Sequence, residues 1–109
     1  MTPNQTIKFL RSLQRELGST RVRMFFKEQS PKIQNEYSLL REDVSVLLGA
    51  ATVERLEAII PRLESHSDEL NERNKLLKES LKELASARRI LTQVDKAVSL
   101  ISRIMVHLL

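Results

Sequence analysis

The side chains best suited to chemistry are two histidines and the polar stretch around the first of them. His66 and His107 lie far apart, so neither the H-x-x-x-H nor the H-E-x-x-H spacing of a zinc site occurs. The stretch Ser65-His66-Ser67-Asp68 contains the residue types of a catalytic triad. Adjacent residues point in different directions, however, whereas a triad converges from separate elements. We therefore interpret Ser65 and Asp68 as a capping box at the start of a helix.

Other catalytic and cofactor-binding signatures are missing from the sequence. The chain has no cysteine, which excludes thiolate catalysis, disulfides and cysteine-ligated metals. Its two isolated glycines cannot form a phosphate-binding loop. The paired E-x-x-H motifs of di-metal helical bundles are also absent. The sequence therefore predicts a protein without catalytic activity, metal, cofactor or small-molecule substrate.

The composition is typical of an all-α protein. Hydrophobic residues make up 41% of the 109 residues and aromatic residues only 4%, with 2 glycines and 3 prolines. Sheets draw on aromatic and β-branched residues, whereas this chain is rich in Leu, Glu, Lys, Arg and Ala. No apolar run approaches the ~20 residues that cross a bilayer, and no secretory signal is present. With no cysteine, we expect a reducing cytoplasmic or organellar interior rather than secretion.

The net charge is +4, from 18 basic and 14 acidic residues. We interpret this excess as an ordinary solvated helical surface. Nucleic-acid binding is an alternative, which the scarcity of aromatic side chains for base stacking disfavours. Contact with an anionic membrane surface is a further alternative.

The first 51 residues are expected to form two or three short helices. The first would begin between Asn4 and Thr6 and end at Leu17, before Gly18, and another would run from Pro31 to Leu48, before Gly49. Between them, residues 20–29 contain Phe25 and Phe26 among cationic side chains. This segment is either a short helix that inserts both rings into the core or an exposed apolar surface that contacts a partner or membrane.

Residues 52–109 carry a strict seven-residue apolar repeat and are expected to form one long helix, with a possible kink near 61–67 at Pro61. The repeat consists of Leu56, Leu63, Leu70, Leu77, Leu84, Leu91, Val98 and Met105. No glycine or proline follows Pro61, so an unbroken helix from Asp68 to Leu109 would be about 60 Å long. We call this apolar line the leucine seam.

The positions beside the leucine seam limit how it could be covered. Asn74 could fix the register of a coiled coil, but Arg88 and Asp95 would lie in the core of a parallel zipper. The last turns, which include Ile101, are apolar nearly all round and should be buried on several sides. Because short N-terminal helices would not cover the whole seam, we expect a homodimer or a larger assembly.

One stretch of the predicted long helix resembles a known family. Residues 68–77, Asp68-Glu69-Leu70-Asn71-Glu72-Arg73-Asn74-Lys75-Leu76-Leu77, followed by Ser80 and Leu81, are similar to the C-terminal helix of the FlgN-type flagellar export chaperones. Lys75 stands where those helices usually carry glycine. The resemblance implies a small helical chaperone that binds an amphipathic helix of its client.

We expect an all-α fold in which short N-terminal helices pack on a long, coiled-coil-like C-terminal helix. We also expect the protein to be oligomeric. The expected function is non-enzymatic protein–protein interaction, as an adaptor, chaperone or assembly subunit. The partner would be a second copy or a helical client. The predicted partner-binding residues are Phe25, Phe26, Leu70, Asn74, Leu77, Leu84, Leu91 and Ile101.

Overall fold

The computed structural model describes all residues, 1–109, and contains only helices. Seven α-helices precede a single 3-10 turn, and no strand is present, so the all-α prediction is confirmed. The four longer helices are α1 (Pro3–Leu17), α3 (Pro31–Ala50), α6 (Ser67–Glu83) and α7 (Ala87–Ile104). The short elements are α2 (Thr20–Lys27), α4 (Val53–Glu57), α5 (Ile60–Ser65) and the 3-10 turn Val106–Leu108. None of the helices is both long and apolar enough to cross a membrane.

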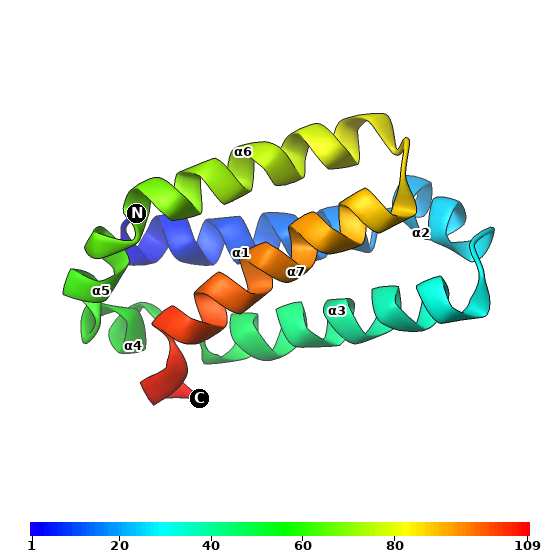
Figure 1. Cartoon of the computed structure of the whole chain (residues 1–109). Helices are drawn as coiled ribbons and strands as arrows, with labels where there is room; N and C mark the ends of the chain where they lie inside the picture. Colours follow the sequence, from blue (N-terminus) through cyan, green and yellow to red (C-terminus); the bar gives the residue numbers. More distant parts are fainter.

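The four longer helices lie side by side as a bundle measuring 42 × 23 × 19 Å (Figure 1). Helices α1 and α6 run in one direction, and α3 and α7 run in the opposite direction. Helix α2 lies at one end of the bundle, whereas α4 and α5 lie at the other. Helix α1 packs on α3, α3 on α7, and α7 on α6, while α1 and α6 have little backbone contact. Three sides of the bundle are therefore closed and the fourth is open.

Side-chain caps fix most of the helix starts. The hydroxyl groups of Ser19, Ser30 and Thr52 each accept a hydrogen bond from a backbone N–H in the first turn of α2, α3 and α4. Thr2 forms a complete capping box with Gln5, so α1 begins slightly earlier than predicted. Helix α3 passes through Gly49 and ends at Ala50, which corrects the predicted end at Leu48.

The hydrophobic side chains of all these helices form one continuous core. It contains 26 buried residues, and the leucine seam contributes Leu56, Leu63, Leu70, Leu77, Leu91, Val98 and Met105. Burying a side chain of this size stabilises the fold by about 1.5–3 kcal/mol relative to leaving it exposed. The seam is thus covered largely by the chain itself.

The prediction of one long C-terminal helix is wrong. Helix α6 ends at Glu83, and after the connection Leu84–Ser86 helix α7 runs back along it. Leu84 adopts the left-handed conformation, with φ 48° and ψ 37°, at a cost of about 1–2 kcal/mol for a non-glycine residue. Folding back buries several apolar side chains of both helices, and this gain exceeds the strain at one residue.

The expected kink near 61–67 appears as two breaks. The backbone turns at Ala58 and Ile59, just before Pro61 in the first turn of α5, and again at His66. The predicted capping box of Ser65 and Asp68 is wrong, because α6 has no side-chain cap. The Ser65 hydroxyl instead donates to the carbonyl of Arg62.

Candidate functional site

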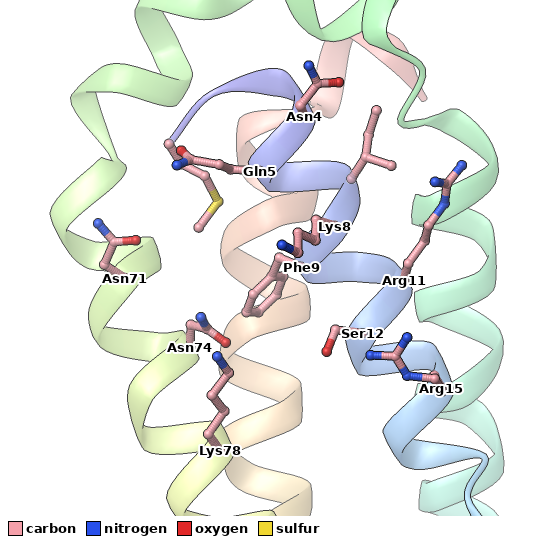
Figure 2. A pocket seen from close by; sticks show the side chains of 12 residues that line it. Asn4, Gln5, Lys8, Phe9, Arg11, Ser12, Arg15, Asn71, Asn74 and Lys78 are labelled. Carbon is pink, nitrogen blue, oxygen red and sulfur yellow. The ribbon is translucent and has the colours of Figure 1, made fainter.

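The open side of the bundle forms a groove between α1 and α6 (Figure 2). The hollow has a volume of about 570 Å³. Its cationic side chains are Lys8, Arg11 and Arg15 from α1 and Lys78 from α6. Side-chain amides from both helices complete the polar lining: Asn4, Gln5, Asn71 and Asn74. No carboxylate lines this hollow, so we call it the cationic groove.

Helical spacing places the charges of α1 on one face. Lys8, Arg11 and Arg15 follow an i, i+3, i+7 pattern and are exposed. Leu10 and Leu17 lie on the opposite face of α1 and are buried in the core. Burial of Leu10 and Leu17 therefore fixes the orientation of α1, so that Lys8, Arg11 and Arg15 point outward.

Helix α6 carries different charges on its two edges. Asn71, Asn74 and Lys78, again spaced i, i+3, i+7, line the cationic groove. Glu79 and Glu83 instead line a separate hollow beside the start of α7. None of the acidic side chains of α6 lines the cationic groove, although α6 contains several carboxylates.

The floor of the cationic groove is apolar. Phe9 and Leu13 of α1 meet Leu77 and Leu81 of α6 around a small hollow of about 20 Å³. Phe9 is 7% exposed and the three leucines are 3% exposed or less, so the floor offers little free apolar surface. Glu16 is the one carboxylate in this part of the site.

The chemistry of the cationic groove is that of hydrogen-bond donation to anions. Ammonium and guanidinium groups donate only, and amide groups both donate and accept. Carboxylate and phosphate oxygens are the acceptors that such donors bind best, particularly the planar guanidinium of arginine. Across the whole chain, no cluster of three histidine, aspartate or glutamate side chains is positioned to hold a metal ion.

The predicted partner-binding residues are mostly inside the protein. Leu70, Leu77 and Leu91 are each 3% exposed or less, which corrects the expectation that a partner reaches this part of the leucine seam, whereas Ile101 is buried as the apolar last turns predicted. Leu84 is half-buried at the break between α6 and α7. Their burial makes them core residues of the isolated chain.

Asn74 and the two phenylalanines lie in separate places. Asn74 is half-buried and lines the cationic groove, instead of facing the core of a coiled coil. Phe26 is buried and Phe25 half-buried, with the two rings edge to face at a centroid distance of 5.3 Å. Helix α2 therefore inserts these rings into the core, which is the first of the two alternatives for residues 20–29.

Sequence reasoning did not identify the cationic groove. The signal was present in the i, i+3, i+7 spacing of Lys8, Arg11 and Arg15, but it covers only one wall. The second wall, with Asn71 and Lys78, comes next to α1 because the chain reverses through α4 and α5 after α3 and returns as α6 alongside α1. The spacing of charges within one helix does not show which other helix packs beside it.

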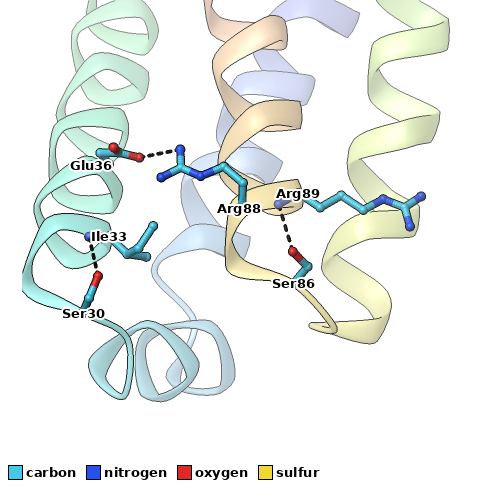
Figure 3. Close-up of polar contacts among 6 residues, drawn as sticks. All are labelled: Ser30, Ile33, Glu36, Ser86, Arg88 and Arg89. Atoms are coloured by element: carbon cyan, nitrogen blue, oxygen red, sulfur yellow. Dashed lines mark hydrogen bonds and ion pairs between the residues drawn. The ribbon is translucent and has the colours of Figure 1, made fainter.

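An ion pair closes the opposite side of the bundle (Figure 3). The guanidinium of Arg88 on α7 donates to a carboxylate oxygen of Glu36 on α3 at 2.8 Å. This hydrogen bond lowers the pKa of Glu36 below its ordinary value of 4.5. The pair lies at the surface, where it aligns α3 with α7 and adds little to stability.

Both histidines lie at the protein surface. His66 Nδ1 is 3.7 Å from a carboxylate oxygen of Glu69, and both side chains are partly exposed. His107 is exposed near the C-terminus. The two histidines thus belong to no shared site.

Comparison of the chain with protein-family models, curated proteins and solved structures finds no match.

Proposed function

We propose that this chain is a non-enzymatic helical binding protein whose cationic groove receives an acidic segment of a partner protein. One observation carries this proposal. Two helices place Lys8, Arg11, Arg15 and Lys78 along the open side of the bundle, and no carboxylate lines the same hollow. A partner helix with acidic residues on one face would meet donors from both walls.

The shape of the groove favours a helix over a flat protein surface as the partner. The groove lies between two helices that run in the same direction, and a bound helix would extend along both. Because the apolar floor is nearly covered, charge and amide contacts would provide most of the specificity. Affinity should therefore be modest and should fall as salt screens the charges.

An export chaperone is a more specific form of the same proposal. Asn71 and Asn74 belong to the stretch that resembles FlgN-type chaperones. Both lie on the α6 wall of the groove. A client helix bound there would contact them directly. Their replacement by alanine should then weaken client binding without changing the fold, because both side chains lie outside the buried core.

The test is binding of a fluorescein-labelled amphipathic peptide with glutamates on one face and leucines on the other, measured by fluorescence anisotropy. The double variant Lys8→Gln/Lys78→Gln should weaken binding by roughly tenfold, since each exposed charge contributes up to about 1 kcal/mol. The matched control Lys27→Gln/Lys32→Gln removes the same charge from exposed lysines outside the groove and should leave affinity unchanged.

The alternatives give different results in the same assay. Equal losses in both double variants would mean that net charge alone attracts the peptide, and the groove would be rejected as its site. A single-stranded oligonucleotide that binds more tightly than the peptide, with the steep salt dependence of phosphate contacts, would favour nucleic acid as the partner. No binding of either probe would contradict the proposal.

A further inference from the structure

The connection between α6 and α7 is short and strained. It consists of Leu84, Ala85 and Ser86, with neither glycine nor proline. Leu84 is the only residue of the chain other than glycine with positive φ. Left-handed backbone is unfavourable for a leucine, and a change of Leu84 to the right-handed region would relieve the strain. It would also allow α6 to continue towards α7.

The sequence supports a continuous helix through this point. Leu77, Leu84, Leu91 and Val98 keep the seven-residue interval on both sides of the connection. No residue between Ser67 and Ile104 is glycine or proline. A single helix over this range would be about 57 Å long. The local sequence is therefore compatible with both the bent form and a straight form.

Two contacts exist only in the bent form. The Arg21 guanidinium donates to the carbonyls of Leu81, at 2.6 Å, and Lys82, which are left free where α6 ends. Ser86 Oγ accepts a hydrogen bond from the N–H of Arg89 and caps α7 (Figure 3). In a continuous helix, the carbonyls of Leu81 and Lys82 would accept from the N–H groups of Ala85 and Ser86, and the N–H of Arg89 would donate to the carbonyl of Ala85.

Straightening would remove α7 from its own bundle and expose core residues such as Val94 and Ile101. A second copy of the chain could cover the exposed surface. Because α7 runs antiparallel to α6, two straight helices lying antiparallel would place the partner's α7 on α6 in the native direction. Every core contact of α7 could then be restored between the two chains.

We propose that this chain forms a dimer by exchange of α7, with Leu84–Ser86 as the hinge that converts α6 and α7 into one helix. The partner is a second copy of the same chain, and the proposal is independent of the cationic groove. A short hinge under strain is a recognised cause of such exchange. The strain at Leu84 favours the dimer, whereas Arg21 and Ser86 favour the monomer.

The decisive variant is Ala87→Pro. Ala87 is the first residue of α7, where proline suits a helix start, and Ser86 already has the extended conformation that a following proline prefers. In a continuous helix the same proline would be internal and would break it. Ala87→Pro should therefore fold as the bent monomer and be unable to exchange α7.

Two further variants should have the opposite effect. Ser86→Ala removes the cap of α7 and should shift the equilibrium towards the dimer by roughly fivefold per chain. Arg21→Gln removes the contact to the end of α6 and should shift it in the same direction. Arg23→Gln, on the same helix and exposed, is the matched control and should behave as the parent protein.

Masses are measured by sedimentation equilibrium after concentrated protein has been partly unfolded in urea and refolded. We expect a dimer of twice 12.6 kDa for the parent protein, more of it for Ser86→Ala and Arg21→Gln, and none for Ala87→Pro. A parent protein that stays monomeric, together with monomeric Ser86→Ala and Arg21→Gln, would overturn the proposal. A dimer that persists in Ala87→Pro would also overturn it, because that dimer would not need a straight hinge.

A distance measurement separates exchange from simple association. The chain has no cysteine, so spin labels can be placed on Lys75→Cys and Lys96→Cys, which lie on neighbouring antiparallel helices. With doubly labelled chains diluted into unlabelled protein, a straight hinge should lengthen the intrachain distance to about 30 Å. A dimer that keeps the short intrachain distance would reject the exchange of α7.

Discussion

The ring of Phe26 lies stacked on the ring of Tyr37, with the centroids 4.2 Å apart and the planes 5° apart. This contact joins α2 to α3, and Phe25 packs edge to face against Phe26 within α2. The Tyr37 hydroxyl also donates a hydrogen bond to the backbone carbonyl of Leu17, the last residue of α1. Three consecutive helices thus meet at Tyr37, which makes this cluster the structural centre of the N-terminal half.

Replacing Phe26 by alanine should strongly destabilise the protein. Phe26 is 1% exposed, and truncation of a fully buried phenylalanine costs about 3–5 kcal/mol. Phe25→Ala, at a half-buried position on the same helix, should cost clearly less. Urea unfolding followed by circular dichroism measures both, and Phe26→Leu provides a milder variant if Phe26→Ala does not fold. Equal losses for Phe25→Ala and Phe26→Ala would contradict the buried stacking arrangement.

Tyr37 should make stability depend on alkaline pH. Burial raises the pKa of Tyr37 above its ordinary value of 10.0. The folded protein then holds the phenolic proton more tightly than the unfolded chain does. Its contribution is therefore complete below pH 10 and is lost as the pH rises through the higher pKa of the folded state.

The comparison variant is Tyr37→Phe, which cannot titrate at this position. At neutral pH it should be less stable by about 1–3 kcal/mol, because the Leu17 carbonyl loses its donor in a buried place. Above pH 10 its free energy of unfolding should fall less steeply than that of the parent protein. Urea unfolding at several pH values between neutral and alkaline measures the difference, and parallel curves would refute the role of Tyr37.

The sequence predicted the local structure of the chain better than its path in space. Ser30 with Pro31 marked the start of α3 correctly, since a cap and a first-turn proline act within a few residues. The apolar positions Leu70, Leu77 and Leu91 were correctly identified as a surface that must be covered. A seven-residue repeat specifies such a surface but does not state whether the cover comes from the same chain or another one.

The break at Leu84 explains most of what the sequence left undetermined. It occurs at a residue that normally favours helix, and its energy comes mainly from packing of α7 on α3 and α6, to which the local cap by Ser86 adds. The cationic groove also depends on packing, because the reversal through α4 and α5 places Lys78 of α6 on the same side of the bundle as Lys8 of α1. Tertiary packing therefore decides both the topology and the candidate site.

Gly49 should be replaceable by alanine with a gain in stability. It lies inside α3, one residue before the helix ends, and a Cβ atom there would meet no atom within 4 Å. Glycine loses more backbone freedom than alanine on entering a helix, so Gly49→Ala should raise the free energy of unfolding by about 0.5–1 kcal/mol. Thermal and urea unfolding should both detect this gain.

Gly18 provides the contrast that tests the steric part of this argument. A Cβ atom at Gly18 would lie 3.1 Å from Nη2 of Arg41 and 3.3 Å from the carbonyl oxygen of Gln14. The arginine can move, but the backbone carbonyl near the end of α1 has less freedom, so Gly18→Ala should give no gain or a loss. If both variants gained equally, open space around the glycine would not be the deciding factor. A loss at Gly49 would instead place the end of α3 before that residue, because alanine is favoured only where the backbone is helical.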